Sequence, residues 1–153
     1  MAAINLQKIS FSQIFLATGF LFIFDRLTKY LAIFLPNEGI FYLPKAGFKL
    51  YFNPAIAFSL PLAQTAAILI ASLIIVILIS FWLKYYFAGR YLFLWPIALV
   101  IIGAISNLFD RFKFEAVIDF IDVWFFPAFN LADCYILIGI IWLVVLAKRL
   151  KME

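Results

Sequence analysis

The chain has 153 residues, of which 68% are hydrophobic and 13% are charged, and its formal net charge is +4. Soluble domains are nearer half apolar and a quarter charged, so this composition indicates an integral membrane protein. The basic residues are scattered or flank apolar segments, so the positive charge does not indicate a nucleic-acid-binding protein. The sequence has no histidine, which excludes Ser-His and Cys-His nucleophile pairs, HExxH zinc sites and His-ligated haem. Its one cysteine, Cys134, excludes an internal disulfide.

The first apolar run covers residues 9–35 and is long enough to cross a bilayer, for which about 20 apolar residues are needed. Asp25 and Lys29 interrupt it towards its end, and Pro36 begins the polar stretch that stops the helix. No small-residue cleavage signal follows this run. We therefore expect a retained membrane helix and not a removed signal peptide.

Residues 40–61 mix Gly, Pro, Asn and Lys with aromatic and aliphatic residues. Residues 48–52 and 56–60 have the composition of short strands, and Asn53 with Pro54 between them is a turn signal. Because an open sheet edge is not tolerated in hydrocarbon, we expect a small extracytoplasmic β-sheet at the membrane surface.

Three further apolar spans are predicted at residues 62–83, 91–109 and 129–147. Residues 111–127 are too polar and too short to cross the membrane, so we expect an interfacial loop or helix there. The sequence thus predicts an all-α membrane protein of one domain, residues 1–153. It would have four transmembrane helices, a small extracytoplasmic β-sheet and an interfacial loop or helix.

Four spans would place both termini on one side of the membrane. The basic residues expected on that side are Lys8, Lys84, Arg90, Lys148, Arg149 and Lys151. This modest excess favours cytoplasmic termini by the positive-inside rule. The remaining polar residues of the spans and outer loops would then share one depth near the outer face. Since distant segments rarely agree in depth by chance, we expect a single polar site between the helices.

The polar residues at this depth carry the functional hypothesis. They are Asp25, Lys29, Asn53, Asn107, Asp110, Arg111, Asp119, Asp122, Asn130 and Asp133. A charge at the centre of a membrane helix costs roughly 2.5–3.5 kcal/mol on insertion scales, so such residues usually pair or perform chemistry. Asp25 and Lys29 are spaced i, i+4 and can form a salt bridge. Asp110 and Arg111 can likewise balance each other's charge, so purely structural roles are open for these four residues.

Asp119 and Asp133 differ because neither has a basic residue within one helical turn. If the two carboxylates converge in a medium of low dielectric constant, they would share a proton and one pKa would rise. One carboxylate could then act as a base towards water while the other donates to a carbonyl, as in aspartic proteases. Spacing alone leaves open whether Asp122 replaces Asp119. It also leaves open that these aspartates are unpaired interfacial residues.

Three asparagines could support such a pair. Asn53, Asn107 and Asn130 can each orient a carboxylate or a substrate amide, or cap a helix end, and Asn130 fits an N-cap of the fourth span. A pair formed by Ser59 and Lys29 is conceivable for acyl transfer, but nothing in the spacing favours it.

Five ordered stretches resemble motifs of the lipoprotein signal peptidases, signal peptidase II. They are DRLTK at 25–29, NPAIAFS at 53–59, GAISNLFDR at 103–111, VIDF at 117–120 and FPAFNLAD at 126–133. The corresponding family patterns are D-x-x-[TS]-K, N-x-G-x-A-F-S, G-A-x-G-N-x-x-D-R, V-[VI]-D-F and F-P-x-F-N-x-A-D. The resemblance covers nearly the whole chain, and five motifs in one order make it specific.

The resemblance implies an aspartic endopeptidase in which Asp119 and Asp133 are the catalytic residues and Asp122 is not. It also implies supporting or substrate-binding roles for several residues of the same motifs. These are Asp25, Lys29, Asn53, Asn107, Asp110, Arg111 and Asn130. It implies no metal and no cofactor.

The implied substrates are diacylglyceryl-modified prolipoproteins, cleaved just before the lipidated cysteine at the outer face of the bacterial cytoplasmic membrane. We expect a multi-pass monomer with both termini in the cytoplasm, in contact with membrane lipid and without a nucleic-acid partner. The small sheet and the aromatic residues 124–126 are expected to hold the substrate from above.

Two positions depart from the family pattern. Ala55 and Ser106 stand where the family usually has glycine, and a side chain there could narrow the pocket or shift substrate preference. A catalytically impaired homologue that only binds lipoprotein precursors is therefore an alternative. A small proton-linked transporter that uses the same carboxylates is another. It would need polar groups along a whole path, and residues 62–83 have almost none.

Overall fold

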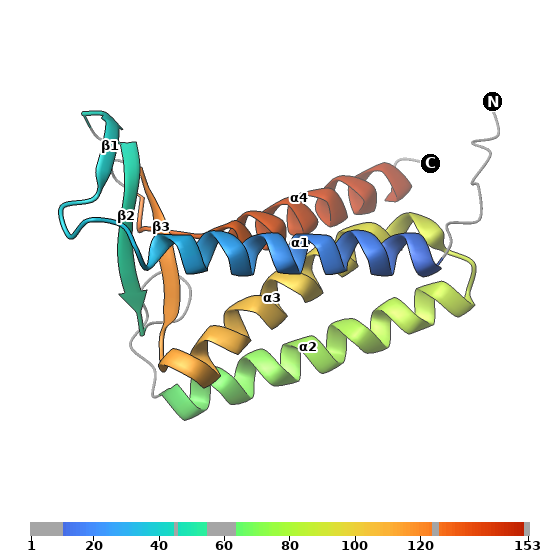
Figure 1. The fold of residues 1–153 in the computed structure, drawn as a ribbon. Coiled ribbons are helices and arrows are strands. Elements are labelled where there is room, and N and C mark those ends of the chain that lie inside the picture. The colour runs from blue at the N-terminus through green and yellow to red at the C-terminus, as the bar shows by residue number, and fades with distance from the viewer. Residues whose placement is uncertain (1–10, 45, 55–63, 124–125, 152–153) are drawn as a thin grey trace.

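The computed structural model describes residues 11–44, 46–54, 64–123 and 126–151. Within them it contains four long helices and a three-stranded sheet (Figure 1). The helices are α1 (Phe11–Ala32), α2 (Gln64–Phe87), α3 (Leu94–Phe114) and α4 (Leu131–Lys151), and a short 3-10 turn, η2 (Tyr91–Phe93), precedes α3. The strands are β1 (Ile40–Leu43), β2 (Ala46–Asn53) and β3 (Val117–Val123). The prediction of a mostly helical protein with a small sheet is confirmed.

The sheet has the order β1-β2-β3 and is antiparallel throughout. It lies across one end of the helices, where α1 and α3 end and where α2 and α4 begin (Figure 1). The start of α1 and the end of α4 lie at the opposite end. The predicted strand at residues 48–52 is part of β2, whereas the predicted strand at residues 56–60 lies outside the described residues.

The expectation of an interfacial loop or helix at residues 111–127 is wrong for most of that stretch. Helix α3 continues to Phe114, and its C-cap residue Glu115 takes a left-handed φ of 57°. The following VIDFIDV segment forms β3 and pairs with β2. This segment forms a strand because of its composition, since β-branched and aromatic residues favour a strand that can bury them against a partner.

Three helical segments of the described chain are long and apolar enough to cross a membrane. They are Gln64–Phe87, Tyr91–Phe114 and Leu131–Leu150. Helix α1 has 22 residues, and the charged residues Asp25, Arg26 and Lys29 lie in its second half. Many large apolar side chains on these helices are exposed, as expected for surfaces that contact lipid.

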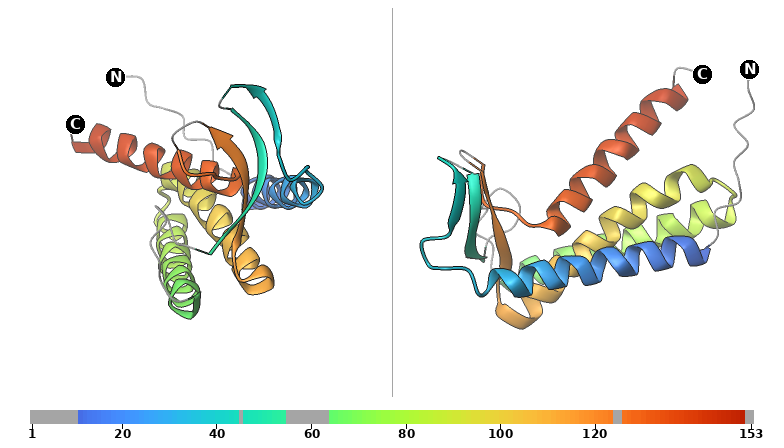
Figure 2. Two further views of the ribbon diagram at one scale, coloured as in Figure 1. Left: turned by 90° about the vertical axis from the view of Figure 1, so that its left-hand side faces the viewer. Right: turned by 45° about the horizontal axis from the view of Figure 1, so that its top comes forward.

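Helix α3 packs against the other three helices and so occupies the centre of the molecule. Its contact with α4 is close, because a Cβ atom built on Gly103 would lie 2.4 Å from the carbonyl oxygen of Ala132. Small residues permit such an approach between membrane helices. Helix α4 starts beside β3 and diverges from the other helices towards its C-terminal end (Figure 2).

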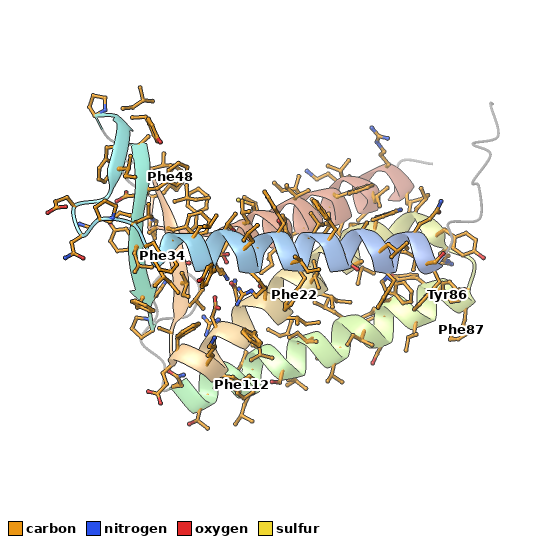
Figure 3. The ribbon with its side chains drawn as sticks, in the orientation of Figure 1. Phe22, Phe34, Phe48, Tyr86, Phe87 and Phe112 are labelled. Atoms are coloured by element: carbon orange, nitrogen blue, oxygen red, sulfur yellow. The ribbon has the colours of Figure 1, made fainter. Side chains whose placement is uncertain are left out.

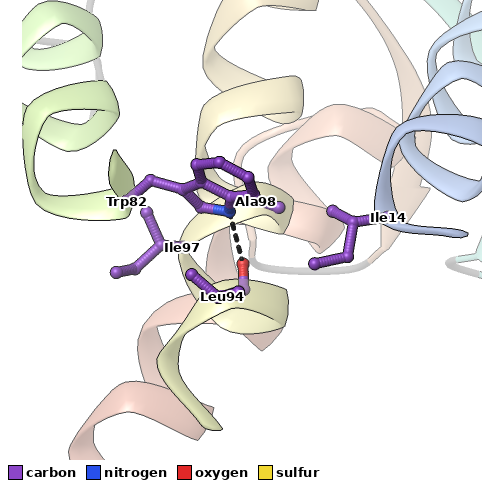
Figure 4. Packing of buried hydrophobic residues seen from close by; sticks show 5 residues of the cluster. All are labelled: Ile14, Trp82, Leu94, Ile97 and Ala98. Atoms are coloured by element: carbon purple, nitrogen blue, oxygen red, sulfur yellow. Dashed lines mark hydrogen bonds between the residues drawn. The ribbon is translucent and has the colours of Figure 1, made fainter. Parts of the chain in front are cut away.

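A cluster of buried apolar side chains joins α1, α2 and α3 away from the sheet (Figure 4). In it, the indole N–H of Trp82 donates a 3.1 Å hydrogen bond to the carbonyl oxygen of Leu94. Leu94 is fully buried, and Ile14 and Ile97 are each 3% exposed. This packing fixes the three helices relative to one another at the end remote from the polar residues.

Candidate active site

Asp119 lies in β3 and is buried, with 2% of its surface exposed. Asn53, the last residue of β2, donates from Nδ2 to Asp119 Oδ2 at 2.9 Å. Asn130 donates from Nδ2 to Asp119 Oδ1 at 2.6 Å. Each carboxylate oxygen is therefore held by one side-chain amide, which fixes the orientation of the group.

Asp133 lies in the first turn of α4. Its Oδ1 accepts a 2.7 Å hydrogen bond from Asn107 Nδ2, and its Oδ2 accepts the backbone N–H of Asn130 at 3.2 Å. The backbone N–H of Asp133 in turn donates to Asn130 Oδ1 at 3.0 Å. These reciprocal bonds form a capping box, so the prediction that Asn130 is the N-cap of this helix is confirmed.

Asn130 is the residue that joins the two aspartates, and the backbone explains how. The segment that leads into α4 runs along β3, where Phe129 exchanges hydrogen bonds of 2.9 and 3.1 Å with Ile121. This pairing places Asn130 directly beside Asp119. One side chain can then donate to Asp119 and accept from Asp133, and the two carboxylates lie in one site.

The environment of Asp119 changes its acidity. Burial raises its pKa most, and the charge of Asp133 raises it further. Hydrogen bonds from Asn53 and Asn130 and the charge of Lys29 act in the opposite direction. The result is a pKa raised to about 6, as is common for carboxyl groups at functional sites.

Behind Asp133 lies a buried group of charges from α1 and α3. Asp25 and Asp110 are fully buried and Lys29 is 1% exposed. Lys29 Nζ lies 2.7 Å from Asp110 Oδ2, 2.8 Å from Asn107 Oδ1 and 3.3 Å from Asp25 Oδ2. The predicted salt bridge between Asp25 and Lys29 is thus confirmed. The bond to Asn107 also fixes the amide whose N–H group binds Asp133.

Arg26 completes this group of charges. Its Nη1 lies 2.5 Å from Asp110 Oδ1 and its Nη2 lies 2.7 Å from Asp25 Oδ2. The sequence paired Asp110 with its neighbour Arg111, but the ion pairs that Asp110 forms with Arg26 and Lys29 come from α1. Spacing along one helix does not predict them, because they depend on how α1 packs against α3.

Arg111 lies in the last turn of α3 and is half-buried. Its guanidinium interacts with the charges of Asp133, Asp119 and Asp110, in decreasing order. The carbonyl oxygen of Arg111 accepts a 2.8 Å hydrogen bond from Gln64 Nε2 at the start of α2. Arg111 therefore provides positive potential on the side of the site that adjoins α2.

Asp122 takes a different environment from Asp119. Asn53 and Asn130 bind the Asp119 carboxylate, whereas the partner of Asp122 is Tyr51. The Asp122 carboxylate accepts a 2.5 Å hydrogen bond from the hydroxyl of Tyr51, and this bond raises the pKa of Tyr51 to about 12. Geometry therefore favours Asp119 over Asp122 as the neighbour of Asp133.

The sequence missed two members of the site. Arg26 was not singled out, although it directly follows Asp25, and Ser106 was noted only as a replacement for glycine. Ser106 is 1% exposed, and its hydroxyl donates to Asp25 Oδ2 at 2.5 Å. Ala55, Ser59 and residues 124–125 lie outside the described part of the chain.

Comparisons with known proteins agree with the motifs. The model of the family described as signal peptidase (SPase) II matches residues 17–148. The lipoprotein signal peptidase of Moorella thermoacetica is 37% identical over 123 residues, which cover 76% of this chain and 80% of that protein. The lipoprotein signal peptidase of Polynucleobacter necessarius is 37% identical over 136 residues, covering 77% of this chain and 80% of the relative.

The fold also matches a known structure. A bacterial membrane enzyme determined by the in meso method at 2.3 Å resolution superposes with a TM-score of 0.82 and 27% sequence identity. The match covers 91% of this chain and 89% of that chain. Apolar helices with a polar site at one end are the architecture of a membrane-embedded enzyme. The chain belongs to the signal peptidase II family of bacterial membrane proteases.

Proposed function

We propose that this protein is an aspartic endopeptidase that removes signal peptides from diacylglyceryl-modified prolipoproteins, just before the lipidated cysteine. Asp119 and Asp133 are its catalytic residues. The observation that carries the proposal is the position of Asn130, whose side chain binds Asp119 and caps the turn that holds Asp133. The relationship to lipoprotein signal peptidases supports the substrate class.

The reaction uses one proton shared by the two carboxylates. The ionised member removes a proton from water, and the water oxygen attacks the carbonyl carbon of the scissile peptide bond. The protonated member donates its proton to the carbonyl oxygen, giving a neutral tetrahedral intermediate. The C–N bond then breaks as the leaving amine takes a proton from one carboxyl group, while a hydroxyl of the intermediate gives its proton to the other carboxylate, which restores the shared proton. A pKa of about 6 for Asp119 suits such proton exchange near neutral pH.

The supporting residues hold this pair in place. Asn53 and Asn130 orient Asp119, and Asn107 orients Asp133. Arg111 supplies positive charge near both carboxylates. Asp25, Lys29 and Asp110 lie behind the pair and fix Asn107 and the adjoining backbone.

The proposed membrane placement has four spans in a single domain. Helix α1 is the fourth span, because its 22 residues extend over about 33 Å at 1.5 Å per residue and its charges are paired inside the bundle. The sheet lies at the outer face and the termini lie in the cytoplasm. A substrate anchored by its lipid arrives in the membrane plane at the depth of the carboxylates, and a monomer suffices to bind it.

Purified protein in detergent should cleave a diacylglyceryl-modified prolipoprotein, with the product identified by mass spectrometry. The expected product begins at the lipidated cysteine. The matched control is the same precursor without the lipid, which should be cleaved far more slowly. A folded protein that binds the precursor and yields no product would support the alternative of a binding-only homologue.

A further inference from the structure

Asp25 and Asp110 each hold the backbone beside one of the proposed catalytic residues. Asp25 Oδ1 accepts the backbone N–H of Ala132 at 2.9 Å, and Ala132 directly precedes Asp133. Asp110 Oδ2 accepts the backbone N–H of Ile118 at 3.3 Å, one residue before the other catalytic carboxylate. The positions of these two buried carboxylates therefore set the backbone on both sides of the site.

The guanidinium of Arg26 joins the two carboxylates. One of its terminal nitrogens binds Asp110 and the other binds Asp25, at 2.5 and 2.7 Å. The group also lies over two aromatic rings, 5.7 Å from the centroid of Phe22 and 5.3 Å from that of Phe109. Phe22 is labelled on α1 in Figure 3. The guanidinium is a planar fork that also contacts two rings, so it holds its two carboxylate acceptors at a set distance from each other.

Arg26 also determines what Lys29 can do. An ammonium group has three protons, and Lys29 Nζ has three acceptors, one each on Asp25, Asn107 and Asp110. Arg26 and Lys29 together balance the two buried carboxylates. Among Asp25, Arg26, Lys29 and Asp110, removal of Arg26 would leave Lys29 as the one cation for both carboxylates. This is unfavourable because a buried charge without a partner is costly. Lys29 would then be drawn away from Asn107.

Ser106 adds a fixed donor to the same group. Its hydroxyl lies 2.5 Å from the Asp25 oxygen that also faces Arg26 and Lys29. The side chain is 1% exposed, so water does not substitute for it easily. The hydroxyl restricts rotation of the Asp25 carboxylate, whose other oxygen holds the backbone of Ala132.

We propose that Arg26 and Ser106 are positioning residues of this enzyme, which hold the two catalytic aspartates in register through Asp25 and Asp110. The proposal rests on the proposed function of that pair. It assigns a role to a serine that stands where related sequences usually have glycine, and to an arginine outside the motif positions.

The test compares Arg26→Gln and Arg26→Lys with Arg90→Gln, a matched change at an exposed arginine. We expect Arg26→Gln to lower kcat by about tenfold to a hundredfold, as small displacements of catalytic groups do, with KM within about twofold. Arg26→Lys should have a kcat between those of the parent and Arg26→Gln, because lysine keeps the positive charge but lacks the forked guanidinium. Arg90→Gln should leave both constants unchanged.

Ser106→Ala provides a milder variant, with Ser80→Ala as its control because the exposed Ser80 hydroxyl donates to the carbonyl oxygen of Val76 in its own helix. We expect kcat to fall severalfold in Ser106→Ala and not in Ser80→Ala. If Arg26→Gln does not fold, Arg26→Lys and Ser106→Ala decide the question.

A second readout does not depend on activity. Hydrogen exchange resolved to single residues should show the amides of Ile118 and Ala132 exchanging at least about tenfold faster in Arg26→Gln, with no change in α2. A structural role spread over the whole protein would raise exchange everywhere.

A double-mutant comparison tests the coupling through Asn107. The fall in kcat caused by Arg26→Gln should be smaller in an Asn107→Ala background, since both changes act on Asp133.

The outcomes separate the two proposals. An inactive parent with faster exchange at Ile118 and Ala132 in Arg26→Gln would remove the proposed function and keep the positioning role. An active parent, with Arg26→Gln equal to Arg90→Gln in kcat and in exchange, would overturn the positioning role and leave the function standing.

Discussion

Asn130 is the side chain on which the geometry of the site depends most. It is fully buried, donates to Asp119 and exchanges two hydrogen bonds with Asp133. A single residue thus combines helix capping with orientation of a carboxylate. The sequence analysis left open whether Asn130 caps a helix or orients a carboxylate, and the structure shows that it does both.

Asn130→Ala should therefore affect both stability and rate. Loss of the cap should lower the free energy of unfolding by about 1 kcal/mol. Loss of a charge-assisted hydrogen bond to Asp119 should lower kcat by about tenfold or more. Thermal unfolding and cleavage rates measure the two effects, with the exposed Asn37→Ala as control. A parental rate in Asn130→Ala would show that the bond to Asp119 is dispensable.

The raised pKa of Asp119 gives a dependence of stability on pH. In the folded protein this pKa is about 6, against a usual value of 3.8. The folded state therefore binds a proton more tightly than the unfolded state, and stability from this group falls as pH rises from about 4 to 6. At about 1.4 kcal/mol per pKa unit, the loss approaches about 3 kcal/mol.

Asp119→Asn keeps a neutral group at this position and should remove that loss. We expect its melting temperature to match the parent near pH 4 and to exceed the parent above pH 7. Asp122→Asn serves as the control because it changes a nearby carboxylate in the same strand. A difference between Asp119→Asn and the parent that stays constant from pH 4 to 7 would contradict the raised pKa.

Among the elements, the contact between α3 and α4 sets the distance between Asn107 and Asp133. A Cβ atom on Gly103 would lie 2.4 Å from the Ala132 carbonyl oxygen and 2.8 Å from Ile136. Because the Ala132 carbonyl oxygen is a backbone atom that cannot rotate away, α3 and α4 would have to separate to make room for a side chain. The strand β3 positions the other carboxylate, since its pairing with β2 brings Asn53 to Asp119.

Gly103→Ala should lower the free energy of unfolding by about 1–3 kcal/mol through this overlap and should also reduce kcat. Gly19→Ala in α1 is the matched control, because its Cβ would meet no atom within 4 Å. There the gain in helix propensity should stabilise the protein by up to about 1 kcal/mol. Melting temperatures and rates of both variants test this, and a Gly103→Ala protein as stable as the parent would contradict the close approach.

At this scale the sequence predicts the helices better than the sheet. Long apolar runs predict α2, α3 and α4 directly, since their length and hydropathy are local properties. Strand β3 was missed because its aspartates made the stretch look interfacial, although its remaining residues favour a strand. Its stability depends on β2, which lies far away in sequence. The ion pairs of Arg26 were missed for the same reason, because they form only when α1 packs on α3.

For the whole molecule, the proposed orientation places the sheet outside the membrane and the helix ends remote from it in the cytoplasm. Figure 1 shows the start of α1 and the end of α4 at the end opposite the sheet. Tyr42 in β1 is 75% exposed and Leu150 in α4 is 50% exposed, so both positions accept a chemical probe.

Cysteine labelling tests this orientation in a Cys134→Ala background, which removes the native thiol. A membrane-impermeant maleimide added to intact spheroplasts should label Tyr42→Cys. It should label Leu150→Cys only after the membrane is permeabilised. Labelling of Leu150→Cys in intact cells would reverse the proposed topology, and the site would then face the cytoplasm.

The aspartic mechanism is tested most directly by cleavage of a diacylglyceryl-modified prolipoprotein by the Asp119→Asn and Asp133→Asn proteins. Asp122→Asn is the matched control on the same strand as Asp119. We expect each of the first two changes to lower kcat by about a thousandfold or more, because residues that act as a unit fail together, while Asp122→Asn stays within about threefold of the parent. Full cleavage by a folded Asp119→Asn or Asp133→Asn protein would contradict the assignment of this pair.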